Sequence, residues 1–569
     1  MNLTLAYRNR SAIVSSPAGL AVALAPNLRR DRVGYDAILR HPLRFREAIG
    51  ALHDVVIGDL RHRPRDRWAH DAYLAAEQAR EDALRRGVTA EARRSLFEAV
   101  DGLSEPDFAR LDRDFRRQRG RYWKARGQYS DYLMTHDQEL WRLLMPCDPV
   151  VTVAPDVLFF ECFSADESSY GCLTVDRGAF DRESDVSLGT TNVDYSWALF
   201  EHFQLLRSYR ETRFRVDPAG FEVETSTGGQ GAGHREEKID LPPNWLRGFS
   251  QIQAAMSLPS RRVPLSREGL YSVLAFLKRH KAARSPRALR FELEPGRPVR
   301  IVLEPWEERI TLHGRPYDGP KAEVVRTWGR DRLQVLARLL PLVDEAEVYL
   351  LGTGLPSFWS ARMGEMRLLL GLSGWTANDW TGGSALAQLA PPAEPGRYLS
   401  IQVAGSFRSH PSQTLAEVAS RSGGSEPEVL ACLNRLAGLG QVIHDLHAGL
   451  YRWRAVMPVA LSAELIGPED PETVAGREIA ATRSVRIARD EARPDGLRDL
   501  EGQILDRPVS LVLDADGRMV RGKCTCSHHH TGGLRRGPCR HLQALRLKAS
   551  GIGRPAPSSL AGWFEALRN

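Results

Sequence analysis

The strongest constraint on the fold of this chain is a group of cysteines and a histidine near its C-terminal end. Cys524 and Cys526 form a Cys-x-Cys pair, and after twelve intervening residues Cys539 and His541 form a Cys-x-His pair. Three thiolates and one imidazole complete a closed tetrahedral shell, which is typical of a structural zinc site rather than a catalytic one. The pattern therefore predicts one structural Zn²⁺ bound by these four residues.

The sequence around this group predicts a small α and β module. Residues 509–514 are expected to form a strand, and Asp516-Gly517 a turn after it. A Cys-x-Cys pair at a strand end directs both sulfurs to one side, because side chains alternate along a strand. Residues 541–548 are expected to form a short helix. The other cysteines are scattered among apolar residues, as buried thiols usually are. They are Cys147, Cys162, Cys172 and Cys432.

This order of ligands, with a strand before it and a helix after it, resembles the SWIM zinc finger. The resemblance covers about a tenth of the chain. It implies a ββα-like fold and zinc bound by Cys524, Cys526, Cys539 and His541. Residues 528–530 are three histidines in the gap, which could compete for the metal. We expect them to lie in an ordinary loop, because the four ligands already fill the shell.

The zinc-finger segment is strongly basic. Residues 518–548 contain eight Lys and Arg and no Asp or Glu. Zinc with three thiolates carries a charge of −1, so the segment keeps about +7, which suits a phosphate backbone. We expect contacts to nucleic acid from Lys523, Arg535, Arg536 and Arg540. The same charge would attract an acidic protein surface, so DNA, RNA and a protein partner all remain open.

The length of 569 residues is too great for one hydrophobic core and indicates several domains. A hydrophobic fraction of 42% and a charged fraction of 26% are those of a folded globular protein. The apolar runs are too short to cross a bilayer, so we expect a cytoplasmic protein without membrane contact. The fold class predicted is multidomain α+β. Its expected parts are residues 1–145, mainly helical; 146–385, α+β; 398–458, winged-helix-like; and 475–550, the zinc finger.

The first two parts are predicted from local patterns. A short apolar stretch at residues 20–25 is expected to form a β-hairpin. Residues 40–145 are expected to be helical, and Ser266 to cap a helix in the second part. Strands are expected at 150–153, 158–160, 221–225, 289–293, 299–303, 309–312 and 347–351, and a helix at 333–340. Proline-rich segments near 391–396 and 468–471 are expected to be linkers.

Residues 412–454 have the pattern of a winged helix. A helix at 414–420, a Gly423-Gly424 turn, a second helix at 426–439 and a hairpin over 441–454 are expected. The second helix begins with two glutamates, which phosphates would repel. The module is therefore expected to serve protein contacts or intramolecular docking rather than nucleic-acid reading.

No arrangement of residues indicates catalysis. Glu161 with Asp166, or His136 with Asp137, could be considered an acid–base pair, but their spacing does not require one. We expect a non-enzymatic protein that binds nucleic acid and other proteins. The layout is similar to bacterial SWIM proteins, some of which are encoded beside MoxR-type AAA+ ATPases. That resemblance implies the alternative of a protein adaptor for such an ATPase, and an enzyme hidden in residues 146–385 is the second alternative.

Overall fold

The computed structural model describes most of the chain outside its N-terminal third. The described residues are 5–7, 12–16, 19–24, 33–58, 149–193, 211–216, 236–238, 243–282, 287–313, 316–374, 396–456, 471–482, 484–493, 497–513 and 519–549, with isolated positions at 110–132 and 203–208. The chain divides into two compact units, residues 60–145 and the remainder. The helices expected in residues 60–145 and the strand expected at 221–225 lie outside the described residues, apart from isolated positions. Within the described part, no helix is long and apolar enough to cross a membrane.

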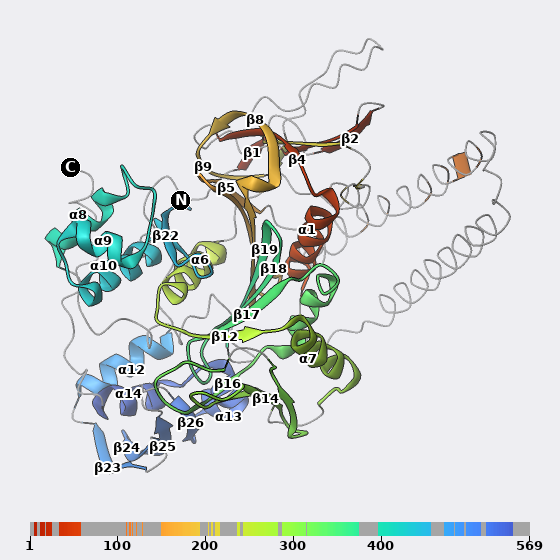
Figure 1. The fold of residues 1–569 in the computed structure, drawn as a ribbon. Helices are drawn as coiled ribbons and strands as arrows, with labels where there is room; N and C mark the ends of the chain where they lie inside the picture. Colours follow the sequence, from red (N-terminus) through yellow and green to blue (C-terminus); the bar gives the residue numbers. More distant parts are fainter. Residues whose placement is uncertain are drawn as a thin grey trace. The chain divides into compact units, whose positions relative to one another are not determined.

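The largest element of the fold is an eight-stranded antiparallel sheet (Figure 1). Two three-stranded meanders, β5-β6-β7 and β17-β18-β19, meet where β7 pairs with β19. Strands β9 and β12 form its two edges. The bounds are β5 Val150–Val153, β6 Val157–Phe163, β7 Ser169–Asp176, β9 Gly189–Asn192, β12 Arg261–Leu265, β17 Glu345–Leu350, β18 Ser357–Met363 and β19 Met366–Leu372. The strands expected at 150–153, 158–160 and 347–351 are thereby confirmed.

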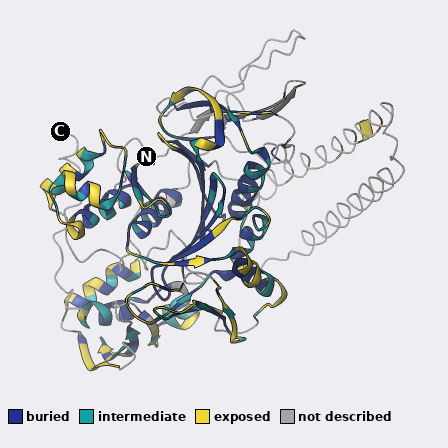
Figure 2. Ribbon diagram, in the orientation of Figure 1, coloured by how far each residue is buried: buried dark blue, intermediate teal, exposed yellow. Residues whose placement is uncertain are grey.

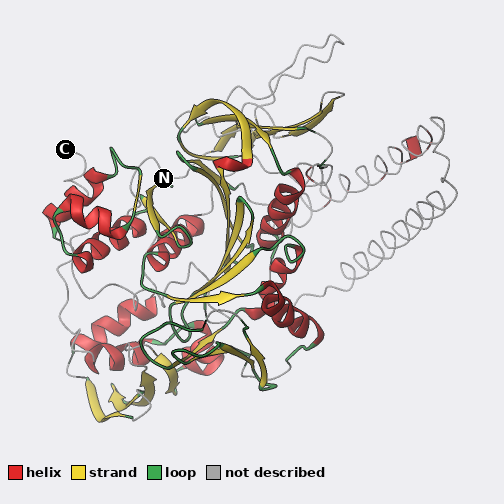
Figure 3. Cartoon of the chain, in the orientation of Figure 1, coloured by secondary structure: helices red, strands yellow, loops and turns green. Residues whose placement is uncertain are grey.

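Helices cover both faces of the central strands, which explains why those strands are buried along nearly their whole length (Figures 2 and 3). Helix α1, Pro42–Val56, packs on β6, β7 and β19. Helix α6, Pro243–Met256, covers the opposite face. A Cβ at Gly171 of β7 would lie 2.8 Å from Leu52 of α1, and one at Gly371 of β19 would lie 3.0 Å from Ile252 of α6. Glycine is therefore what allows both helices to approach the sheet closely.

The N-terminal strands join a second, five-stranded sheet. Its order is β2-β3-β10-β4-β8, and β3 with β10 is the parallel pair within it. The bounds are β2 Ala12–Ser16, β3 Gly19–Leu24, β4 Gly34–Leu39, β8 Phe180–Ser187 and β10 Thr212–Val216. Strands β2 and β3 are antiparallel neighbours, so the hairpin predicted there is confirmed. Separately, β1 Leu5–Tyr7 pairs with β11 Glu236–Lys238.

A four-stranded antiparallel sheet follows α7, Arg267–Arg279. Its strands are β13 Leu289–Leu293, β14 Arg300–Leu303, β15 Glu308–Thr311 and β16 Glu323–Thr327. Ser266 caps α7 by accepting a hydrogen bond of 3.1 Å from the backbone N–H of Gly269, as the sequence predicts. The helix expected at 333–340 is instead a 3-10 helix, η3, at Arg330–Arg338. The spacing of the apolar residues indicates a helical conformation, but it does not distinguish an α-helix from a 3-10 helix.

Residues 396–456 form a compact module with its own apolar core. The elements are α8 Arg397–Ser406, β20 Ser412–Gln413, α9 Leu415–Ser422, α10 Glu426–Gly438, β21 Val442–Asp445 and β22 Leu450–Trp453. The two later helices and the hairpin are confirmed, whereas α8 was not predicted. Glu417 and Glu428 complete capping boxes at the starts of α9 and α10. The acidic start of α10 is thus explained by helix capping.

The module of residues 396–456 docks on the last turn of α6. That turn leaves backbone carbonyls without partners inside the helix. Asn434 of α10 donates to the Ala254 carbonyl at 2.8 Å, and Tyr451 donates to the Ser257 carbonyl at 3.3 Å. The Nδ1 atom of His444 lies 2.7 Å from the Met256 carbonyl oxygen. Helix α10 thus packs against α6 within the same chain. Such intramolecular docking is one of the two roles left open by the sequence, and contact with a partner protein is the other.

A buried ion pair fixes the same module to the central sheet. Arg454, which follows β22, donates to Glu161 of β6 at 2.9 Å, and both side chains are fully buried. Tyr170 of β7 donates a second hydrogen bond to the same carboxylate oxygen at 2.5 Å. Burial raises the pKa of Glu161, and the Arg454 charge and the Tyr170 hydroxyl oppose this shift. Removal of either residue would leave the charge of the other buried without its partner.

Candidate metal centre

The cysteine-rich segment belongs to a C-terminal module of one antiparallel sheet and two main helices. The sheet order is β23-β24-β25-β26, and α14 packs on all four strands. Helix α12 in turn packs on α14. The bounds are α12 Pro471–Ala481, β23 Val485–Ala492, β24 Arg498–Ile504, β25 Arg507–Leu513, β26 Met519–Cys524, α13 Ser527–Gly532, η5 Gly533–Arg536 and α14 Arg540–Ala549.

The linker predicted near residues 468–471 is wrong at its last residue, and positions 468–470 lie outside the described residues. Pro471 was expected in a linker, but it is the first residue of α12. Proline is tolerated in the first turn of a helix, because its missing N–H has no partner there in any case. The acidic Glu472 that follows is also typical of a first turn. The predicted strand at 509–514 and helix at 541–548 correspond to β25 and α14, while the predicted turn at 516–517 lies outside the described residues.

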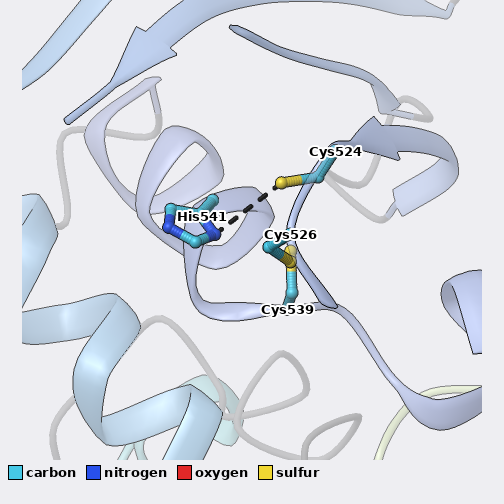
Figure 4. A group of neighbouring side chains, drawn as sticks. All are labelled: Cys524, Cys526, Cys539 and His541. Atoms are coloured by element: carbon cyan, nitrogen blue, oxygen red, sulfur yellow. Dashed lines mark hydrogen bonds between the residues drawn. The ribbon is translucent and has the colours of Figure 1, made fainter. Parts of the chain in front are cut away.

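The structure brings the four predicted ligands together (Figure 4). Cys524 ends β26, Cys526 follows it, Cys539 precedes α14, and His541 lies in the first turn of α14. Their four donor atoms all lie within 4.8 Å of one another, and Cys524 Sγ is 3.7 Å from His541 Nδ1. Ligands of one tetrahedral metal ion with bonds of roughly 2.0 to 2.3 Å lie roughly 3.3 to 3.8 Å apart. The group can therefore hold a metal ion.

The surroundings of the thiols also suit a metal ion. The backbone N–H of His529 donates to Cys526 Sγ at 3.4 Å. Burial raises the pKa of the Cys539 thiol, and the nearby Cys524 adds to this shift. A bound cation reverses such shifts, because it stabilises the thiolates directly. The arrangement of donor atoms and the hydrogen bond to Cys526 thus suit three thiolates bound to a metal ion better than three protonated thiols without one.

The three histidines between the ligand pairs lie in α13, not in the loop that was expected. This short helix starts directly after Cys526, whose sulfur accepts the N–H of His529 as a cap. One of the predicted metal ligands, Cys526, therefore caps this helix. Within the described residues, the group of potential metal ligands contains the four predicted residues and none of these histidines.

The contact of Glu472 with Arg540, the residue between two of the predicted ligands, was not predicted from the sequence. The Glu472 carboxylate accepts the backbone N–H of Arg540 at 2.8 Å and the Arg540 side chain through Nε at 3.1 Å and Nη2 at 2.5 Å. Arg540 was expected to contact nucleic acid, and in the structure its charge is paired with Glu472. The available signal was the acidic residue after Pro471, but the contact spans 68 residues and could not be read from local spacing.

Of the other residues expected to contact nucleic acid, Lys523 lies on the edge strand β26, beside Arg521, which was not among the predicted contacts. Arg521 and Lys523 of β26 are exposed, and neither pairs with a carboxylate among the described residues. Arg535 and Arg536 lie in η5, and their side chains fall outside the described part of the structure. The edge strand β26 therefore carries two exposed positive charges that have no carboxylate partner among the described residues.

Helices α12 and α14 approach each other closely at Gly476. A Cβ placed there would lie 2.6 Å from Gln543 Cβ and 3.2 Å from the Arg540 carbonyl oxygen. We expect Gly476→Ala to push the helices apart and to destabilise the module by about 1 to 3 kcal/mol. Hydrogen exchange at the α14 amides would measure this, with Val474→Ala on the exposed side of α12 as control. Unchanged exchange in Gly476→Ala would show that the helix contact contributes little.

The other polar groups considered from the sequence have structural partners. Glu161 is bound by Arg454 and Tyr170. Asp166 accepts hydrogen bonds from the hydroxyls of Ser164 and Ser168 at 2.6 and 2.5 Å, which stabilises the turn between β6 and β7. His136 and Asp137 lie outside the described residues.

Comparison with known proteins assigns no family. No protein-family description and no curated protein matches the sequence. Among solved structures, the chain is similar to the Proliferating Cellular Nuclear Antigen of Entamoeba histolytica, at 12% identity and a TM-score of 0.28, over 40% of this chain and 89% of that one. The PCNA of Thermococcus kodakaraensis gives 12% identity and a TM-score of 0.26, over 40% of this chain and 90% of that one.

Proposed function

We propose that the C-terminal module is a SWIM-type zinc finger that binds one structural Zn²⁺ and presents a basic edge to nucleic acid. The observation that carries this proposal is the convergence of Cys524, Cys526, Cys539 and His541 to within 4.8 Å. A tetrahedral set of three sulfurs and one nitrogen is characteristic of zinc. All four positions are filled by protein, so the ion stabilises the module and has no open position for a substrate.

The nucleic-acid role is supported by the charges on β26. Arg521 and Lys523 point into solvent without a carboxylate partner among the described residues, and Arg535 and Arg536 add two more positive charges to the same segment. We leave Arg540 out of the contact surface, because Glu472 neutralises it. The winged-helix-like module is assigned a different role. Its second helix, α10, packs on α6 of the same chain, so we assign the nucleic-acid contacts to the C-terminal module alone.

Charge reversal tests this surface. The triple variant Lys523→Glu, Arg535→Glu, Arg536→Glu should weaken DNA or RNA binding by about 100-fold or more at moderate salt. The slope of the logarithm of the binding constant against the logarithm of the salt concentration should become shallower by about one unit per lost phosphate contact. Fluorescence anisotropy with labelled single-stranded DNA, double-stranded DNA and RNA measures both. The double variant Arg397→Glu, Arg408→Glu, at exposed sites on and just after α8, is a control that should bind normally.

Failure of the wild-type protein to bind any of these nucleic acids at low salt would overturn the nucleic-acid role. The module would then be a protein-docking module, and a MoxR-type AAA+ ATPase is the partner that the sequence resemblance suggests. In either role we assign the chain no catalytic step.

A further inference from the structure

The two halves of the metal centre are supported differently by the rest of the module. Cys524 ends a strand that is already hydrogen-bonded to β25. Cys539 and His541 flank the start of α14, where the first backbone N–H groups have no partner within the helix. The Arg540 N–H lies between these two ligands and is one of these groups. It therefore needs an acceptor from outside the helix, either a side chain or water.

Glu472 of α12 supplies this acceptor. One of its oxygens accepts the Arg540 N–H, and both oxygens accept from the Arg540 guanidinium. The Glu472 side chain is 14% exposed, so the contact is largely shielded from water. Burial raises the pKa of Glu472, but its hydrogen bonds with Arg540 outweigh this and hold the pKa below its usual value. Glu472 is thus ionised, and an ionised carboxylate accepts stronger hydrogen bonds than a neutral carboxyl group.

The rest of α12 holds Glu472 in this position. Thr473, Gly476 and Ala480 are buried and recur at helical spacing, so one face of α12 packs on α14. The close approach at Gly476 fixes the distance between the helices. The carboxylate therefore has little freedom to leave the start of α14.

We propose that Glu472 is a positioning residue for the metal centre, because it fixes the backbone between Cys539 and His541. The metal-binding unit then begins at α12, more than fifty residues before the first cysteine ligand. This inference rests on the zinc site proposed above. Groups that orient metal ligands without touching the metal change metal affinity by about 10- to 100-fold when they are removed.

The test compares three variants of the full-length chain. Glu472→Ala removes the acceptor, Glu472→Gln keeps an oxygen for the Arg540 N–H but loses the charge, and Glu478→Gln changes an exposed carboxylate on the same helix. Zinc affinity is measured by competition with a chromogenic chelator. The absorption bands of the cobalt-substituted protein report the geometry of the ligands.

We expect Glu472→Ala to bind zinc about 10- to 100-fold more weakly and to shift the cobalt bands. Glu472→Gln should fall between Glu472→Ala and wild type, and Glu478→Gln should match wild type. If Glu472→Ala does not fold, Glu472→Gln decides the question by the same two measurements. A variant that melts at a lower temperature but keeps wild-type zinc affinity and cobalt bands would overturn the positioning role. A wild-type chain that binds no zinc would instead overturn the metal centre itself.

Discussion

Replacing Cys539 by serine should release the metal and unfold the C-terminal module while the rest of the chain stays folded. Cys539 is fully buried and belongs to the core of that module. Structural zinc contributes roughly 10 to 16 kcal/mol to the folding of small zinc-finger peptides, so loss of one ligand removes much of the folding energy. Hydrogen exchange should then show loss of protection in β26 and α14, and metal analysis should show loss of the ion.

Cys432→Ser is the matched control for this experiment. Cys432 is equally buried, but it lies in the core of residues 396–456, where its sulfur is 3.4 Å from the Ser400 hydroxyl. The control should keep its metal and the protection of α14. A Cys539→Ser protein that retained one metal ion per chain would show that the ligands are assigned incorrectly.

Replacing Arg454 by methionine should destabilise the central sheet and loosen the module of residues 396–456. The substitution leaves the Glu161 carboxylate buried without its cation, which typically costs about 3 to 5 kcal/mol. Urea unfolding would measure the loss, and hydrogen exchange should locate it in β6, β7 and β22. The double variant Glu161→Gln, Arg454→Met should be more stable than Arg454→Met alone, because it contains no unpaired buried charge.

The cost of Arg454→Met should also depend on pH. Burial raises the pKa of Glu161, and the Arg454 charge that opposes this is absent in the variant. A carboxyl whose folded-state pKa is raised binds protons more readily when folded, so stability falls as pH rises through that pKa. The variant should therefore lose more stability at pH 8 than at pH 5. Equal losses at both pH values would show that Glu161 is not the group responsible.

Features with local causes could be predicted from the sequence. Ser266 caps α7, and Gly423 follows α9 in the left-handed conformation that glycine favours. The Cys-x-Cys and Cys-x-His pairs identified all four residues that converge in the structure. In each case the signal and its structural consequence lie within a short stretch of the chain, at most 17 residues for the metal ligands.

Features that depend on distant contacts could not be predicted. The pairing of β7 with β19 joins segments about 190 residues apart and has no local signature. The Arg454–Glu161 pair and the Glu472–Arg540 contact likewise depend on where whole elements pack. Pro471 was placed in a linker because proline is common both in linkers and in the first turn of helices. Only the packing of α12 on α14 shows that it begins a helix here.

The metal content of the full-length chain, purified without added metal and measured beside its protein concentration, tests the central claim most directly. We predict one zinc ion per chain, lost on treatment with a strong chelator together with the hydrogen-exchange protection of α14. A chain that contains no metal, yet shows a protected α14 before and after the chelator, would contradict the account.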